Sequence, residues 1–163
     1  MMEPAQRRTD IPVLILHNID PVWDPNEKST AYEAVEKLKT GLHEEGHPVV
    51  DVPVVDDSLE ETLQAYHPDD YIVFNWCEGL PGLPRSEDRV ARILEACSFA
   101  YTGSCPDVIA FSWDKAATKD LLKKNDIPTP AGMVVNGRNI GAWSRFPAIV
   151  KPAYEHCSFG ITE

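Results

Sequence analysis

Short runs of β-branched and other apolar residues alternate with segments of helical periodicity over residues 11–103, and few folds are compatible with that alternation. The runs are IPVLILHN, VVDVPVV, YIVFNWC and the shorter AYTG. Between them apolar residues recur at helical spacing, as at Tyr32, Val35, Leu38 and Leu42. Strands that alternate with helices form parallel sheets through crossover connections. We therefore predict an α/β, Rossmann-like domain over residues 10–105.

Capping residues mark the expected helix ends in this domain. A helix is expected within residues 29–45, because Gly46 suits the residue after a helix C-terminus. Asp57 or Ser58 is the expected N-cap of a second helix, and Ser86 is the expected N-cap of a third. The four apolar runs then become four strands with helical connections between them.

The pattern changes after the AYTG run. PDVIAF predicts a brief helical turn, and a longer helix is expected from Ser112 or Asp114 to about Asn125. The prolines of IPTP end it, because proline has no backbone N–H, and an extended hinge into a GMVV strand follows. FPAIVKPA is predicted as a further strand, before the small-residue turn EHCSFG. Residues 106–163 are thus expected to begin a second domain that is cut short after ITE.

Composition and charge exclude several classes of function. The formal net charge of −11 repels polyphosphate backbones and no basic cluster interrupts it, so no nucleic-acid partner is expected. The apolar runs are far shorter than the roughly 20 residues that span a bilayer. No apolar segment follows the charged N-terminus, so a cytoplasmic protein without a membrane partner is expected. The irregular cysteine spacing favours reduced thiols over disulfides or a zinc site.

Two lysines stand in unusual places. Lys151 lies within the predicted strand AIVKPA, where it is either a surface lysine with a packed stem or an anion contact. The small residues that follow, at 155–160, favour an anion contact, because they let backbone N–H groups approach phosphate oxygens. Lys115 begins a predicted helix, where a cation is slightly unfavourable against the helix dipole. That position hints at a ligand.

Other titratable residues have ordinary explanations. Glu78 and Glu87 are candidates for paired carboxylates, although a glutamate in the first turn of a helix is favoured by the dipole in any case. Four histidines show no metal-ligand spacing and are expected to be structural or solvated: His17, His43, His47 and His67.

Taken together, the segments resemble the ATP-grasp family, and within it the D-alanine–D-alanine ligases and their relatives. The resemblance covers residues 70–163 and rests on FNWCEGLPG, the SED of residues 86–88, AYTGS, WDKAATKDLLKKNDIPTP and FPAIVKPAYEHCSFGI. It implies a pre-ATP-grasp domain over residues 10–105, followed by the start of an ATP-binding domain. It also implies that Lys115 and Lys151 contact the phosphates of ATP.

In that family the loop after the V-K-P strand folds over the phosphates and the first substrate. The loop residues implied here are Glu155, His156, Cys157, Ser158, Phe159 and Gly160. The resemblance implies ATP and magnesium as cofactors. The magnesium ligands are expected after Glu163, so no metal ligand is expected within this chain.

The chain departs from the family pattern around the first substrate. Its first strand leads into HNIDPVWDPNEKS instead of G-G-x-S-x-E, and Glu27 best matches the glutamate that binds the ammonium of the first D-alanine. NWCEGLPGLPRSED replaces H-G-x-x-G-E-D-G, keeps Glu87 at the glutamate position and lacks the histidine. Cys157 replaces a serine that helps to hold the first substrate. These changes favour a different amino-acid or carboxylate substrate, with Glu27 and Glu87 as its binding candidates.

The resemblance implies an ATP-dependent carboxylate–amine ligase that forms an amide or peptide bond through an acylphosphate from small-molecule substrates. The chain is expected to be an incomplete, inactive N-terminal portion, and an open sheet edge at residues 148–150 would let two copies pair as a homodimer. The alternative is a non-catalytic Rossmann-like module for ligand binding or dimerisation. A dinucleotide-binding domain is disfavoured, because no G-x-G-x-x-G follows the first strand.

Overall fold

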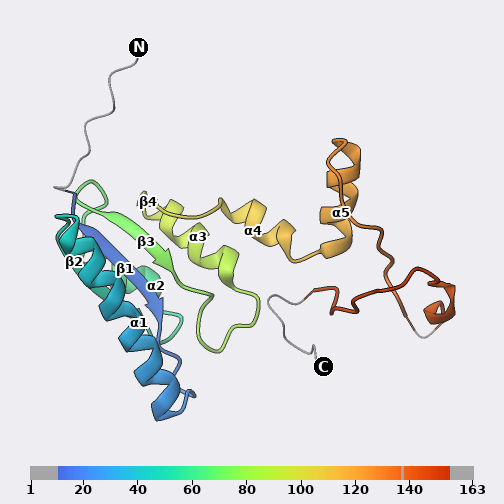
Figure 1. Cartoon of the computed structure of the whole chain (residues 1–163). Coiled ribbons are helices and arrows are strands. Elements are labelled where there is room, and N and C mark those ends of the chain that lie inside the picture. Colours follow the sequence, from blue (N-terminus) through green and yellow to red (C-terminus); the bar gives the residue numbers. More distant parts are fainter. Residues whose placement is uncertain (1–10, 137, 155–163) are drawn as a thin grey trace. The chain divides into compact units, whose positions relative to one another are not determined.

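The computed structural model describes residues 11–136 and 138–154 (Figure 1). The chain divides into two compact units, Met1–Pro106 and Asp107–Glu163, which we call unit 1 and unit 2. Unit 1 is an α/β structure built on a four-stranded parallel sheet. The fold class predicted from the alternating pattern is therefore confirmed.

The strands of unit 1 are β1 (Val13–Asn18), β2 (Val49–Val54), β3 (Ile72–Trp76) and β4 (Ala100–Tyr101). Their order in the sheet is β2-β1-β3-β4, so β1 is hydrogen-bonded on both sides. The chain runs from β1 outward to β2 and then returns across β1 to β3, which reverses the direction of winding. Such a reversal leaves a crevice at the carboxyl ends of the two strands that flank it.

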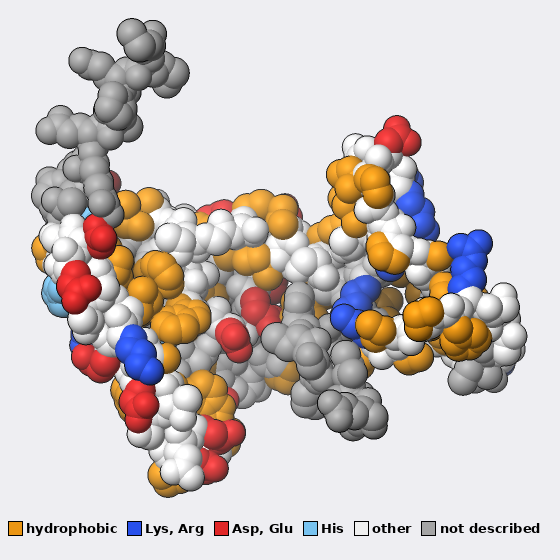
Figure 2. Space-filling view, in the orientation of Figure 1, with side chains coloured by type: hydrophobic (Ala, Val, Ile, Leu, Met, Phe, Trp, Pro, Cys, Tyr) orange, Lys and Arg blue, Asp and Glu red, His pale blue; other side chains and the backbone are white. Residues whose placement is uncertain are grey.

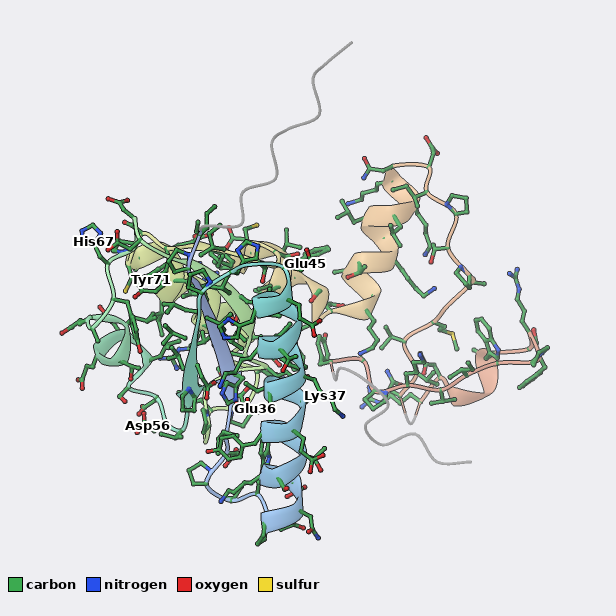
Figure 3. The ribbon with its side chains drawn as sticks, turned by 60° about the vertical axis from the view of Figure 1, so that its left-hand side comes forward. Glu36, Lys37, Glu45, Asp56, His67 and Tyr71 are labelled. Atoms are coloured by element: carbon green, nitrogen blue, oxygen red, sulfur yellow. The ribbon has the colours of Figure 1, made fainter. Side chains whose placement is uncertain are left out.

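Helices cover both faces of this sheet. α1 (Pro25–Glu44) packs on one face, where Val35 meets Val13 and Ile15. α2 (Leu59–Leu63) and α3 (Glu87–Ala96) pack on the other face. There the buried cluster consists of Leu14, Leu16, Val52, Val54, Leu59, Leu63, Val73, Cys77, Leu80, Val90, Leu94 and Phe99. Figure 3 labels Glu36 and Lys37 on α1, and His67 and Tyr71 on the side of the sheet away from that helix.

α1 begins at Pro25, four residues before the predicted start. Asp24 caps it, because its Oδ1 accepts hydrogen bonds from the backbone N–H groups of Asn26 at 2.7 Å and Glu27 at 2.9 Å. In return the Glu27 carboxylate accepts from the backbone N–H of Asp24 at 2.8 Å, which completes a capping box. Proline at the first helical position suits this start, since its missing N–H has no partner there.

α2 and α3 begin after the predicted Ser58 and Ser86. Neither serine side chain caps its helix. The hydroxyl of Ser58 donates to Asp56, and the buried hydroxyl of Ser86 donates to the carbonyl of Leu83. The serine positions were thus predicted correctly, while the bonds that they form depend on the preceding loops.

The described part of unit 2 contains helices but no strand. α4 (Pro106–Ser112) and α5 (Lys115–Lys124) agree with the predicted helices, and η1 (Ile140–Ala142) is a short 3-10 turn. The strands predicted at residues 132–135 and 146–153 are wrong, because both segments are irregular. A strand needs a neighbour for its backbone hydrogen bonds, and the described residues of unit 2 provide none. Lys151 accordingly lies in an irregular, exposed segment.

Candidate functional site

A cleft of about 170 Å³ opens at the carboxyl ends of β1 and β3. This is the position at which the strand order reverses and at which open α/β sheets bind their ligands. Four parts of unit 1 line the cleft: the end of β1, the loop before α1, α1 itself and the end of β3. The lining residues are His17, Asn18, Trp23, Ala31, Ala34, Val35, Trp76 and Glu78. We take it as the candidate site of unit 1.

Asn18 holds the loop that follows β3 against the end of β1. Its Nδ2 donates to the carbonyl of Gly79 at 2.8 Å, and its Oδ1 accepts from the backbone N–H of Glu78 at 2.6 Å. Gly79 has a φ of +133°, and a Cβ there would lie 2.9 Å from the Ser86 hydroxyl. Only glycine fits this position without strain. The backbone of Glu78 is therefore fixed beside β1, while its side chain remains exposed at the cleft.

His17 is a buried polar residue in the wall of the cleft, with 3% of its surface exposed. Its Nε2 lies 2.7 Å from Oδ1 of Asp51 on β2, and its ring packs edge-on against Tyr32 of α1. Contacts with two different elements hold the imidazole in one orientation.

Cys77 lies directly before Glu78 but is not a reactive thiol. Its Sγ donates to the carbonyl of Gly79 at 3.0 Å, and burial raises the pKa of Cys77 to about 11. The thiolate, which is the nucleophilic form, is therefore scarce at neutral pH. Cys77 serves packing and loop geometry.

The two glutamates predicted to bind substrate are not among the residues that line the cleft. Glu27 accepts the capping-box hydrogen bond at the start of α1. Glu87 is the first residue of α3 and is half-buried there. The carboxylate that does line the cleft belongs to Glu78. Trp23 and Trp76 were not singled out for binding, and Glu78 was named only as a candidate for paired carboxylates. Their places at the end of β3 or shortly after β1 and β3 are a signal that could have identified them.

In unit 2 the structure brings the two predicted lysine segments together. The backbone N–H of Lys115, the first residue of α5, donates to the carbonyl of Ala153 at 3.4 Å. Ala153 is two residues beyond Lys151, so the segment that carries Lys151 meets the start of α5. Lys151 is exposed.

The position of Lys115 at the start of a helix also has a local explanation. Asp114 is the N-cap of α5 and accepts from the backbone N–H groups of Ala116 and Ala117, both at 2.9 Å. Its negative charge at the helix N-terminus offsets the unfavourable placement of a cation in the first turn.

A third lysine organises the hinge after α5. Nζ of Lys119 donates to the carbonyl of Pro130 at 2.6 Å and to the hydroxyl of Thr129 at 3.2 Å. Its stem also lies against Gly132. This role could not be predicted from the sequence, because it depends on the chain turning back along α5.

The six residues predicted for the phosphate loop lie outside the described residues: Glu155, His156, Cys157, Ser158, Phe159 and Gly160. Within residues 11–136 and 138–154, no group of three His, Cys, Asp or Glu side chains could hold a metal ion. In charge, Lys115 and Lys151 fit the phosphates of ATP, whereas the described residues provide no ligand set for magnesium. In the same part of the chain no helix is long and apolar enough to cross a membrane.

The amino-acid sequence is similar to those of several known proteins. No model of a protein family matches the chain. An uncharacterized protein, y4sG, of Sinorhizobium fredii is 34% identical over 113 residues, which cover 65% of this chain and 33% of that protein. The D-alanine–D-alanine ligase of Aquifex aeolicus is 34% identical over 137 residues, which cover 76% of this chain and 44% of the ligase. The D-alanine–D-alanine ligase of Alcanivorax borkumensis is 44% identical over 78 residues, which cover 47% of this chain and 25% of the ligase.

The fold and these similarities define an α/β domain of the kind found in the N-terminal part of a ligase. The chain is a relative of the D-alanine–D-alanine ligases and corresponds to their N-terminal part. The resemblance predicted from its motifs is thus confirmed. The chain spans less than half of the length of the curated relatives described above.

Proposed function

We propose that this chain is the N-terminal portion of an ATP-dependent carboxylate–amine ligase. In the proposed reaction a carboxylate oxygen of the first substrate takes the γ-phosphoryl group of ATP, which releases ADP. The amine of the second substrate then attacks the carbonyl carbon of the acylphosphate and expels phosphate, which leaves an amide or peptide bond. The contribution expected of this chain is binding, positioning and charge neutralisation.

The observation that carries this proposal is the backbone hydrogen bond from Lys115 to Ala153 at 3.4 Å. It joins the start of α5 to the segment of Lys151, although the two are far apart in sequence. Two lysines on adjoining segments suit a polyphosphate, because a charge-assisted contact to phosphate is stronger than a neutral hydrogen bond.

The distribution of charge favours unit 2 over unit 1 as the part of the chain that contacts ATP. Unit 1 contains 20 acidic and 8 basic residues, whereas unit 2 contains 6 acidic and 7 basic residues. On the face shown in Figure 2, acidic side chains predominate over unit 1 and most basic side chains lie over unit 2. Unit 2 therefore repels an anionic nucleotide far less than unit 1 does.

The proposal is tested in the protein encoded by the full reading frame. Lys115→Met and Lys151→Met each remove one charge-assisted contact and keep the apolar stem. Each is expected to weaken ATP binding by about tenfold or more. Lys124→Met, at the exposed end of α5, is the matched control and leaves ATP binding unchanged. Nucleotide affinity and turnover equal to those of the parent in both variants would refute the assignment.

A second candidate function is a non-catalytic binding module. The observation in its favour is that the described residues that line the cleft all belong to unit 1, so unit 1 can bind a ligand without a nucleotide. ADP release that depends on a carboxylate and an amine separates the two functions, because only the ligase produces it.

A further inference from the structure

We propose that the cleft of unit 1 binds an organic ammonium ion with an apolar body about the size of one ring. Glu78 is its counter-ion, and the indoles of Trp23 and Trp76 are its walls. The biological role of this ligand rests on the proposed function, because the bound ammonium ion would be a substrate of the ligase. The binding itself involves only unit 1 and does not require ATP.

The charge of the cleft favours a cation. Among the described residues that line the cleft, Glu78 is the carboxylate, and none is a lysine or an arginine. The nearby Lys28 is held elsewhere, because its Nζ donates to the carbonyl of Pro21 at 2.8 Å. An anionic ligand would face the negative charge of Glu78 and the acidic field of unit 1. A ligand ammonium instead supplies the missing positive charge.

The walls favour an apolar body. Two indoles and the side chains of Ala31, Ala34 and Val35 line the cleft, and Trp76 is 43% exposed. Tryptophan is the side chain that attracts cations best through its ring face. A cavity of about 150 Å³ in another protein holds one benzene molecule. A cleft of about 170 Å³ therefore has room for one ring, and it is more than a small ligand such as alanine would fill.

The cleft is also held in shape before any ligand enters. Asn18 fixes the backbone of Glu78 at 2.6 Å, and Asp51 fixes the imidazole of His17 at 2.7 Å. Nδ1 of His17 is buried without a hydrogen-bond partner among the described residues. Buried polar atoms are nearly always paired in native structures, so a polar atom of a ligand would complete this position. A preorganised site loses less conformational entropy on binding.

Glu78 is assigned this role over Glu27 on geometric grounds. The carboxylate of Glu27 already accepts the backbone N–H of Asp24, and α1 would lose its capping box if that carboxylate turned to a ligand. Glu78 has a fixed backbone and an exposed side chain at the cleft.

The test titrates the 163-residue chain with three probes and follows the indole N–H resonances by NMR. The probes are benzylamine, the neutral benzyl alcohol and D-alanine. Benzylamine is expected to shift the resonances of Trp23 and Trp76 and to bind at least about fivefold tighter than either other probe. Trp143 of unit 2 is the internal reference and keeps its position. Equal binding of benzylamine and benzyl alcohol, or tighter binding of D-alanine, overturns the proposal.

Variants locate the site. Glu78→Gln is expected to weaken benzylamine about fivefold and to leave benzyl alcohol unchanged, since an exposed ion pair contributes modestly. Trp76→Leu is expected to weaken both ring-bearing probes. Glu60→Gln, on α2 at the opposite face of the sheet, is the control and changes neither. A Glu78→Gln protein that keeps its dispersed spectrum and its full benzylamine affinity overturns the proposal. Failure of the ligase proposal would appear separately, as unchanged ATP binding in the lysine variants.

Discussion

Two apolar segments adopt different structures in this molecule. Residues 13–18 form β1, the central strand, where Ile15 and Leu16 are completely buried. Ile149 and Val150 lie in an irregular segment of unit 2 and are 76% and 80% exposed. The residue types are alike and the neighbours differ, because β1 pairs with β2 and β3. Strand propensity thus produces a strand only where a ladder and a packed face are available.

The helices repeat this contrast. α3 and α5 are both ten residues long, yet α3 buries Val90, Ala91 and Leu94 while every residue of α5 is at least partly exposed. Tertiary packing supplies most of the stability of a helix in a protein. We therefore expect unit 1 to be the more stable unit, and four predictions test that difference.

The largest effect is expected in the core of unit 1. Leu16→Ala removes a completely buried side chain of the central strand from the core that packs under α2 and α3, and is expected to cost about 2–5 kcal/mol. Val150→Ala, at an 80% exposed position of unit 2, is expected to stay within about 0.5 kcal/mol. Urea unfolding of both variants measures the difference. Equal losses would mean that residues 149–150 are packed in solution.

A second effect distinguishes two glycines with similar close contacts. Gly79→Ala forces a side chain onto a φ of +133° and toward the buried Ser86 hydroxyl, which is expected to cost about 1–3 kcal/mol. Gly132→Ala meets only the flexible stem of Lys119, at 3.0 Å, and is expected to cost less than about 0.5 kcal/mol. Thermal unfolding of the pair checks this order, and a reversed order would contradict the loop geometry around Asn18.

A third effect is a loss of stability at alkaline pH that is confined to unit 1. Burial raises the pKa of Cys77 from 9.0 to about 11 in the folded chain. Its contribution is fully present below pH 9 and is lost as the pH rises from 9 to 11, because the unfolded chain releases the proton first. The expected loss at pH 10 is about 1.4 kcal/mol.

Urea unfolding at pH 8 and pH 10 measures this loss through the resonances of unit 1. Cys77→Ala is expected to reduce the slope over that range, and a smaller slope remains because burial also raises the pKa values of Cys97 and Tyr101. An unchanged slope in the variant would assign the loss to another group.

The smallest effect compares two helix caps. Asp24→Ala removes a capping box from a helix packed on the sheet and is expected to cost unit 1 about 1 kcal/mol. Asp114→Ala removes a cap that lacks the reciprocal glutamate, and we expect about half that cost, seen as fraying of the first turn of α5. Backbone chemical shifts and amide exchange separate the two outcomes. Equal fraying of both helices would contradict the expectation that packing makes unit 1 the more stable unit.

Much of unit 1 could be predicted because its signals are local. Helical spacing on α1 and α3 and the apolar strand runs follow from neighbouring residues, and so does the start of α5 at Asp114. The early start of α1 was also visible in principle, since Asp24 and Glu27 have the spacing of a capping box. Glu27 was instead interpreted as a substrate contact, because it best matches the glutamate that the related ligases carry after the first strand. Sequence spacing alone could not separate the two roles.

The candidate cleft could not be predicted in the same way. Asn18 and Gly79 are 61 residues apart and meet only because β3 returns to the side of β1 opposite β2. Trp23, Trp76 and Glu78 come together through that same strand order. In unit 2 the contact between Lys115 and Ala153 likewise depends on a chain reversal.

The sequence by itself determined which segments of this protein become helices and which apolar runs can become strands, because periodicity, caps and prolines act over a few residues. It also carried the motifs that relate the chain to the D-alanine–D-alanine ligases. Only the tertiary structure decided the order β2-β1-β3-β4 and the lining of the cleft. It also decided that residues 146–153 are not a strand. A strand, a cleft and an ion site each require groups from distant parts of the chain, and their meeting is a property of packing.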